Sequence, residues 1–162
     1  MNITIFRIDD RLIHGQIVTA WLNYADAKQI IVADDKAAKD TLQQSLLKMA
    51  TPKGIELKIV SIEEAKKLLQ EDDSNVNTLF LVRGPVEANE VIDFMPDVKS
   101  INVGNLNMRK GKEKVLGNLW VFPEDIEAFK SIEQKGIEME FRTVPNDRSQ
   151  SPINLLKKNK LI

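Results

Sequence analysis

The sequence is organised around one charged stretch near its start, Phe6-Arg7-Ile8-Asp9-Asp10-Arg11-Leu12-Ile13-His14-Gly15-Gln16. An apolar run at residues 3–6 precedes the charges, and apolar residues at helical spacing follow from Ile17 onward. This pattern predicts a strand, a short turn and a helix. The only histidine of the chain, His14, falls where the turn meets the helix. We expect both the fold and its functional site to depend on this turn.

The composition is that of an ordinary single domain. The chain has 162 residues, of which 43% are hydrophobic and 29% are charged, which suits one domain spanning residues 1–162. The formal net charge of −1 gives no basic field for nucleic acid. The absence of cysteine excludes disulfides, thiolate zinc sites and thiol catalysis, and a single histidine excludes a multi-histidine metal site within one chain. With no signal peptide or membrane-length apolar run, we expect a cytoplasmic location.

Strand-like apolar runs alternate with helical patterns along the whole chain. The expected strands are residues 3–8, 29–33, 55–60, 78–82, 100–103, 119–122 and 137–144. The expected helices are residues 17–25, 36–50, 61–70, 86–94, 123–135 and 153–156. This alternation predicts an α/β fold with an open, mostly parallel central sheet and helices on both faces.

Three segments carry more specific expectations. Residues 36–50 read as one helix, and its expected apolar side is made of Leu42, Leu46, Leu47 and Met49. Residues 108–115 read as an exposed basic loop. Residues 137–144 alternate between apolar and charged side chains, which is typical of an edge strand with one wet face. We therefore expect an antiparallel edge strand near the C-terminus, where a second copy of the chain could pair.

The ends of the strands are the expected place for a ligand. In parallel α/β sheets, ligands collect at the carboxyl ends of strands, near the point where the strand order reverses. The turn that leads to His14 follows one such end. Arg83 follows another, and Asn102 lies close to a third. Arg83 and Asn102 are therefore candidates to complete the site.

The charged turn has the chemistry of an anion site. Arg7 and Arg11 are close enough in sequence to reach the same anion, and the N–H groups at the start of the following helix favour an anion too. In this setting His14 could be a general base, could bind an anionic ligand, or could accept a phosphoryl group as a nucleophile. Asp9 or Asp10 would orient the arginines or fix the imidazole tautomer.

Plainer explanations exist for the same residues. A lone histidine is usually a surface residue or a satisfied core residue. The aspartates could serve only as turn and helix-capping residues. The arginines could form surface pairs with those acids, which contribute little to stability. Residue types and spacing alone leave these possibilities open.

The string from Arg7 to Gln16 closely resembles the signature of the mannose-type enzyme IIB component of the bacterial phosphoenolpyruvate-dependent sugar phosphotransferase system, a family that covers mannose, fructose, sorbose and N-acetylgalactosamine. The similarity extends over nearly the whole chain. It includes Ile30-Ile31-Val32 followed by Asp34, Ser100-Ile101-Asn102-Val103-Gly104, Gly111-Lys112, Asp125-Ile126-Glu127-Ala128-Phe129-Lys130 and Gly136-Ile137-Glu138. Asn105 departs from the pattern, because a second glycine is expected there in the family.

The resemblance implies a phosphoryl relay. His14 would accept a phosphoryl group on Nδ1 from a phosphohistidine of a IIA partner. It would then pass the group to a sugar during uptake through the membrane components IIC and IID. Arg11 matches the position closest to the phosphoryl group. The expected catalytic residues are His14, Arg11 and Asp10, with Arg7, Gly15 and Gln16 as phosphate-binding or supporting residues and Asp9, Arg83 and Asn102 as further candidates.

We expect no cofactor and no metal, because histidine itself would carry the phosphoryl group and the sequence has neither a Walker loop nor an acidic cluster for magnesium. Membrane association is expected only through partners. The basic loop at residues 109–114 could dock an acidic partner or simply be solvated. Two other classes of function stay open: a non-catalytic phosphate-ligand sensor or regulatory homologue, and an unrelated α/β enzyme that uses His14 as a general base.

Overall fold

The structure is a computed structural model that describes the backbone of residues 1–162 and every side chain except those of Gln16 and Ile17. Its centre is a six-stranded sheet in the order β3-β2-β4-β1-β5-β8, in which every adjacent pair is parallel. The strands of this sheet are β1 (Asn2–Ile8), β2 (Gln29–Ala33), β3 (Glu56–Val60), β4 (Asn77–Val82), β5 (Ser100–Val103) and β8 (Glu138–Phe141).

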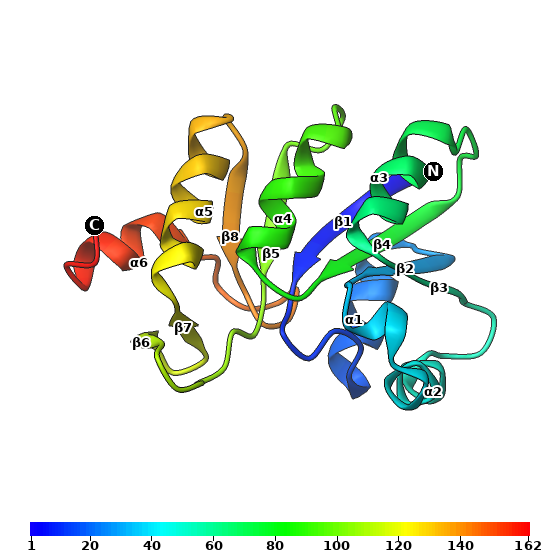
Figure 1. Cartoon of the computed structure of the whole chain (residues 1–162), viewed down its shortest axis with the longest axis horizontal. Helices are drawn as coiled ribbons and strands as arrows, with labels where there is room; N and C mark the ends of the chain where they lie inside the picture. The colour runs from blue at the N-terminus through cyan, green and yellow to red at the C-terminus, as the bar shows by residue number, and fades with distance from the viewer.

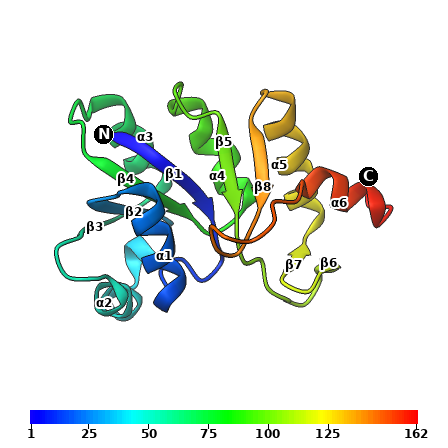
Figure 2. The same cartoon turned by 180° about the vertical axis from the view of Figure 1, so that it is seen from behind.

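Helices cover both faces of the sheet. One face carries α1 (Gly15–Ala25) and α2 (Thr41–Ala50), and the other carries α3 (Ile62–Glu71), α4 (Pro85–Val91) and α5 (Pro123–Gln134). Figure 1 shows α3, α4 and α5 in front of the strands, and Figure 2 shows α1 on the opposite side. The open parallel sheet with helices on both faces confirms the α/β class expected from the sequence.

Each face of the sheet has its own apolar core. The core under α1 and α2 includes Trp21 and Leu47, together with Leu12 and Ile13 from the charged turn. The core under α3, α4 and α5 includes Phe80, which meets Phe6 edge to face. The inner strands β2 and β4 are therefore buried on both sides, as their continuous apolar runs predict, whereas the edge strands β3 and β8 are partly exposed.

The register of the strands brings three carboxyl ends to one level. Ile8, the last residue of β1, pairs with Val82 of β4 on one side and with Val103 of β5 on the other. The connection after β1 runs to one face, whereas the connections after β4 and β5 run to the other. The residues after these three strands therefore meet where the connections diverge, which is where ligands bind in such sheets.

The edge of the sheet differs in detail from the sequence-based expectation. Residues 138–141 do form an edge strand, β8, but β8 runs parallel to β5. The antiparallel pairing near the C-terminus lies outside it, in a single bridge between Phe141 and Gln150 and in the separate pair β6 (Glu113–Leu116) and β7 (Leu119–Val121). A crossover through α5 returns the chain in the same direction, which makes β8 parallel.

The prediction of an exposed loop at residues 108–115 is wrong for its last part. Glu113–Leu116 form strand β6, and Val115 within it is buried. Gly117 and Asn118 link β6 to β7. This residue pair is typical of a β-hairpin turn, so the hairpin could have been predicted from the sequence. The short C-terminal helix α6 (Pro152–Lys158) packs against this hairpin, α5 and β8.

The helix expected at residues 36–50 is two helices. A short 3-10 helix, Ala37–Lys39, ends at Asp40, and the carboxylate of Asp40 then caps α2 by accepting from the backbone N–H of Gln43 at 3.1 Å. The apolar side expected for this helix is also only partly right. Leu47 is buried, whereas Leu42, Leu46 and Met49 are exposed.

Adjacent leucines of α2 should therefore respond very differently to truncation. Leu47→Ala removes a buried side chain and should lower the free energy of unfolding by about 3 kcal/mol. Leu46→Ala removes an exposed one and should change it by less than about 0.5 kcal/mol. Urea denaturation of the two variants checks this pair, and equal losses would contradict the burial pattern of α2.

Candidate functional site

The turn between β1 and α1 is held in a specific backbone conformation. Leu12 has a φ of 58° and is buried, and Gly15 begins α1 with a φ of 46°. This conformation is uncommon for a bulky non-glycine residue, and residues held in it cluster at functional sites. His14 is the residue directly before α1, in an extended conformation. The turn thus places one imidazole at the start of a helix.

The carboxylate of Asp9 is the centre of the site. It is fully buried, with an exposed fraction of 0%. Its Oδ2 atom accepts from Arg7 NH2 at 2.9 Å, from His14 Nε2 at 2.8 Å and from Asn105 Nδ2 at 3.1 Å. Its Oδ1 atom accepts from the backbone N–H of Arg11 at 3.0 Å. Four donors therefore converge on a single buried negative charge.

The surroundings of Asp9 favour its ionised form. Burial disfavours that form, but the hydrogen bond from His14 and the positive charge of Arg7 outweigh the burial. The pKa of Asp9 is consequently held below its ordinary value. Burial lowers the pKa of Arg7 and its pairing with Asp9 opposes that shift, yet a guanidinium stays protonated in proteins. Arg7 and Asp9 form a buried ion pair.

The two contacts of the imidazole define its tautomer. An ionised carboxylate only accepts hydrogen bonds, so Nε2 must carry the proton that points to Asp9. A guanidinium only donates, and Arg11 NH2 lies 2.6 Å from Nδ1, so Nδ1 must present its lone pair. The His14 side chain is 14% exposed. Nδ1 is therefore the ring nitrogen with the free lone pair, and it faces the exposed side chain of Arg11.

The structure separates the two arginines that the sequence placed together. Arg11 is exposed beside Nδ1, whereas Arg7 is buried beneath the turn, so only Arg11 can follow an anion at the surface. The Arg7 guanidinium donates to Asn102 Oδ1 and to the Arg142 carbonyl oxygen, and it lies over the Trp21 ring at 5.2 Å. Asn102 reaches the site only through Arg7. Both residues support Asp9 from below.

Glycine is required where Arg7 passes the end of β5. A Cβ atom added to Gly104 would overlap the Arg7 guanidinium. The next residue, Asn105, is the position that departs from the expected glycine. It is buried and donates to Asp9, while its own Oδ1 accepts from Asn118 Nδ2 at 3.0 Å. Asn118 also donates to Thr143 Oγ1 at 2.9 Å. The only sequence signal for these hydrogen bonds was that Asn105 stands where the family is expected to have a glycine.

Asp10 and Arg83 lie beside the imidazole site but do not contact His14. The Asp10 carboxylate accepts from the backbone N–H of Asn107 at 2.6 Å and from its side chain at 2.8 Å. Arg83 binds Asp34 through two nitrogens, at 3.0 and 2.8 Å, and donates to the Asp10 carbonyl oxygen. The hydrogen bonds to Asp34 raise the pKa of Arg83 above its ordinary value. These residues brace neighbouring loops around the turn.

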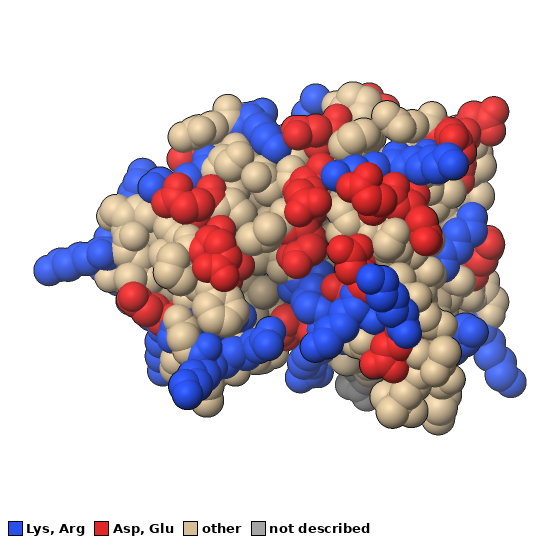
Figure 3. All heavy atoms as spheres, in the orientation of Figure 1, with Lys and Arg blue, Asp and Glu red and all other residues tan. Residues whose placement is uncertain are grey.

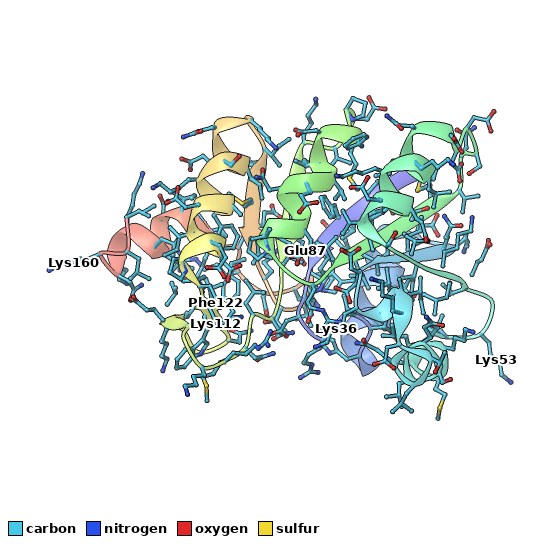
Figure 4. The ribbon with its side chains drawn as sticks, in the orientation of Figure 1. Lys36, Lys53, Glu87, Lys112, Phe122 and Lys160 are labelled. Atoms are coloured by element: carbon cyan, nitrogen blue, oxygen red, sulfur yellow. The ribbon has the colours of Figure 1, made fainter. Side chains whose placement is uncertain are left out.

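A polar cavity of about 440 Å³ opens on the other side of Asp10. Its lining includes Arg83, Lys36, Glu87 and Arg109. Figure 4 shows Glu87 at the end of α4 and Lys36 below it, near the strand ends. Burial raises the pKa of Glu87. This cavity is separate from the imidazole, because none of its lining residues contacts His14 through the hydrogen bonds of the described side chains.

The remaining expected residues fall on the start of α1. Gly15 is its first residue and places the backbone N–H groups of the first turn next to His14. The side chain of Gln16 lies outside the described part of the structure. Among the helices that the structure describes, none has the length and apolarity needed to cross a membrane.

Known proteins match the chain over almost its full length. The family model described as "PTS system sorbose subfamily IIB component" matches residues 3–162. The sorbose-specific EIIB component of Klebsiella pneumoniae is 33% identical over 159 residues, which are 98% of this chain and 95% of that protein. The mannose-specific EIIAB component of Escherichia coli (strain K12) is also 33% identical over 159 residues, 98% of this chain but only 49% of that longer protein.

A solved structure matches equally well. The crystal structure of the IIBSor domain of the sorbose permease from Klebsiella pneumoniae superposes with a TM-score of 0.92 at 30% identity, covering 98% of each chain. The fold and these matches define a phosphotransferase-system component of the IIB class. The chain belongs to the sorbose subfamily of these IIB components.

The buried pair of Asp9 and Arg7 predicts a large effect of Asp9→Asn. The variant leaves the buried Arg7 guanidinium without its charged partner and should lower the free energy of unfolding by about 3 kcal/mol near neutral pH. Because the pKa of Asp9 is lower in the folded state, the ionised carboxylate stabilises the fold above its ordinary pKa of 3.8, and this contribution is lost as the pH falls through the folded value. Urea denaturation should therefore show the difference from wild type shrinking in strong acid.

Asp10→Asn is the matched control, because it removes the neighbouring carboxylate. It should cost about 1 kcal/mol, since only the hydrogen bonds to Asn107 weaken. An equal or larger loss for Asp10→Asn would contradict the central position given to Asp9.

Proposed function

We propose that His14 is the phosphoryl carrier of this IIB component. The observation that carries the proposal is the pair of contacts on the imidazole, Nε2–H to Asp9 and Nδ1 to Arg11. The proton is held on one ring nitrogen, so the lone pair on the other is ready to attack phosphorus. A nucleophilic histidine needs this tautomer, and a buried carboxylate is a common way to fix it.

The donor is a phosphohistidine on a IIA protein, and the acceptor is a sugar taken up through the membrane components IIC and IID. The matched relatives support this pathway by name, since one is called sorbose-specific EIIB and another is a mannose-specific EIIAB, in which a IIA part and a IIB part share one chain. The sugar belongs to the mannose, fructose, sorbose and N-acetylgalactosamine class. The protein works in the cytoplasm and reaches the membrane through these partners.

The transfer follows from the geometry without a proton relay. The lone pair of His14 Nδ1 attacks phosphorus as the bond between phosphorus and the donor imidazole breaks, and that imidazole leaves with the bonding electrons. The proton on Nε2 stays on the hydrogen bond to Asp9, which stabilises the positive charge that develops on the ring. In the second step a sugar hydroxyl oxygen bonds to phosphorus as the Nδ1–phosphorus bond breaks. The bonding electrons return to Nδ1, and the hydroxyl proton passes to water or to a base beside the sugar, so that His14 regains its neutral ring and the sugar phosphate leaves.

Arg11 supplies the charge that the phosphoryl group needs. It already donates to Nδ1 and is exposed, so its guanidinium can turn to the phosphoryl oxygens when the new bond forms. His14 is the N-cap residue of α1, so the unpaired backbone N–H groups of the first turn follow it directly and favour an anion at this helix end. Phosphoryl transfer depends mainly on alignment and charge stabilisation of this kind.

His14→Ala should abolish labelling by a phosphorylated IIA protein while leaving the fold intact. Asp9 keeps its donors from Arg7, Arg11 and Asn105, so the free energy of unfolding should change by about 1 kcal/mol or less. Acid-labile, base-stable incorporation of radioactive phosphate measures the reaction, and circular dichroism checks the fold. Undiminished labelling of His14→Ala would exclude the proposal. Ligand binding near His14 without any labelling of the wild type would favour a sensor instead.

Arg11→Ala should slow the transfer by about a hundredfold, since it removes one donor to the transferred group. Its stability should stay within about 0.5 kcal/mol of wild type, because the side chain is exposed. Lys67→Ala, at an exposed cation on α3, is the matched control and should transfer at the wild-type rate. Equal rates for Arg11→Ala and Lys67→Ala would show that Arg11 has no role in the transfer.

A further inference from the structure

The exposed side of α2 carries an uncovered apolar stripe. Leu42, Leu46 and Met49 are 70%, 56% and 82% exposed. Their spacing of four and three residues places them on one side of the helix. The inward side of α2 is held by Leu47, so folding of the chain does not require the stripe to be apolar. A contiguous group of large exposed apolar side chains marks a surface for a partner.

The stripe lies at the same end of the molecule as His14. Arg83 connects the two, because it donates to the Asp10 carbonyl oxygen in the charged turn and to Gln43 Oε1 on α2. Leu12 of the turn and Leu47 of α2 also share one apolar core. Figures 1 and 2 show α2 beside the end of α1 at which that helix begins. A protein that covers His14 can therefore reach the stripe.

A fourth exposed apolar side chain lies outside α2, in the loop after β5. Met108 is 64% exposed and follows Asn107, whose backbone and side chain both bind the Asp10 carboxylate. The Asp10 carboxylate therefore holds the loop that carries Met108 beside the turn. The Asp10 carbonyl oxygen, through Arg83, connects the turn to α2 on the other side. The hydrogen bonds with Asn107 give the Asp10 carboxylate a structural purpose that does not require contact with the imidazole.

Positive charge surrounds these apolar groups. The exposed cations of the turn, of residues 35–48 and of the loop after β5 are Arg11, Lys36, Lys39, Lys48, Arg109 and Lys110, and they outnumber the exposed acids of the same segments, Asp35 and Asp40. Figure 3 shows Lys and Arg gathered at the lower centre of the molecule, next to uncharged surface over α2, while Asp and Glu gather over α3, α4 and α5. Because the chain as a whole has a net charge of −1, this basic end is a local feature. It is complementary to a partner face with an apolar centre and an acidic rim.

We propose that Leu42, Leu46, Met49 and Met108, with the cations around them, form the docking surface for the phosphodonor protein. This inference rests on the proposed function, because the donor phosphohistidine must come within bonding distance of Nδ1. The donor surface around its own histidine must then lie over the residues next to His14. A donor face that fits would be apolar at its centre with Asp and Glu at its rim, and the phosphoryl group that it carries adds further negative charge.

The test measures phosphorylation of His14 as a function of donor concentration. The probes are the phosphorylated IIA part of the Escherichia coli mannose-specific EIIAB component and phosphorylated IIA proteins of the sorbose and fructose types, and the donor with the highest wild-type rate is used. The double variant Leu46→Gln/Met49→Gln should raise KM for the donor about tenfold, while kcat stays within about twofold of wild type. Circular dichroism and urea denaturation confirm that the variant folds.

The control variant is Val76→Gln, an exposed apolar residue just before β4 at the opposite end of the sheet. It should leave both KM and kcat unchanged. Lys39→Glu/Lys48→Glu should also raise KM, and added salt should reduce the difference from wild type because exposed charges are screened. If neither Lys39→Glu/Lys48→Glu nor Leu46→Gln/Met49→Gln raises KM, the proposal is wrong.

Other outcomes separate the docking surface from the phosphocarrier function. A wild-type KM for the double variant, with His14 still labelled, would overturn the docking surface and leave the proposed function standing. A normal KM for the donor together with slower sugar phosphorylation would assign the stripe to a membrane component and overturn the proposal. If no donor labels the wild-type protein, the proposed function fails and the docking surface fails with it.

Discussion

The structure of the site depends on the buried carboxylate of Asp9. A negative charge without solvent contact is costly unless donors surround it, and here four donors do. They come from β1, from the turn, from the start of α1 and from the end of β5. Each of these elements therefore binds the same carboxylate. The fold brings them together through the register that places Val82 and Val103 on either side of Ile8.

The same carboxylate links stability to chemistry. By accepting from Nε2, it leaves the lone pair of Nδ1 without a proton. Arg7 pairs with this carboxylate and Asn102 accepts a hydrogen bond from Arg7, so the buried charge stays compensated. Asn105 adds a donor that glycine at that position could not supply. Asp10 turns away and braces the loop that carries Met108, so two adjacent aspartates serve the inner and outer parts of one site.

Much of this arrangement could be predicted from the sequence. Alternating apolar periods indicated the parallel sheet, and the strand–turn–helix pattern placed His14 at a strand end. The expected ranking of Asp9 and Asp10 was wrong, because Asp10 was placed with the catalytic residues and Asp9 only among the further candidates, whereas Asp9 binds His14 and Asp10 binds Asn107. Strand alternation, which puts Arg7 and Asp9 on one side and Asp10 on the other, would have favoured Asp9. The role of Asn105 depends on a contact across ninety-six positions that no local pattern encodes. The apolar side expected for α2 is mostly exposed, because helical periodicity identifies the apolar residues of a helix but does not show whether another element covers them.

The central claim is that Asp9 fixes the tautomer that makes Nδ1 of His14 the phosphoryl acceptor. The chain has a single histidine, so nitrogen-15 labelling of histidine gives one imidazole to follow by NMR. In the unmodified protein with a neutral ring, we expect a protonated Nε2 and an unprotonated Nδ1. After phosphorylation by a IIA donor, we expect the phosphorus coupling on Nδ1. A proton on Nδ1 of the neutral ring, or phosphorus on Nε2, would contradict the claim.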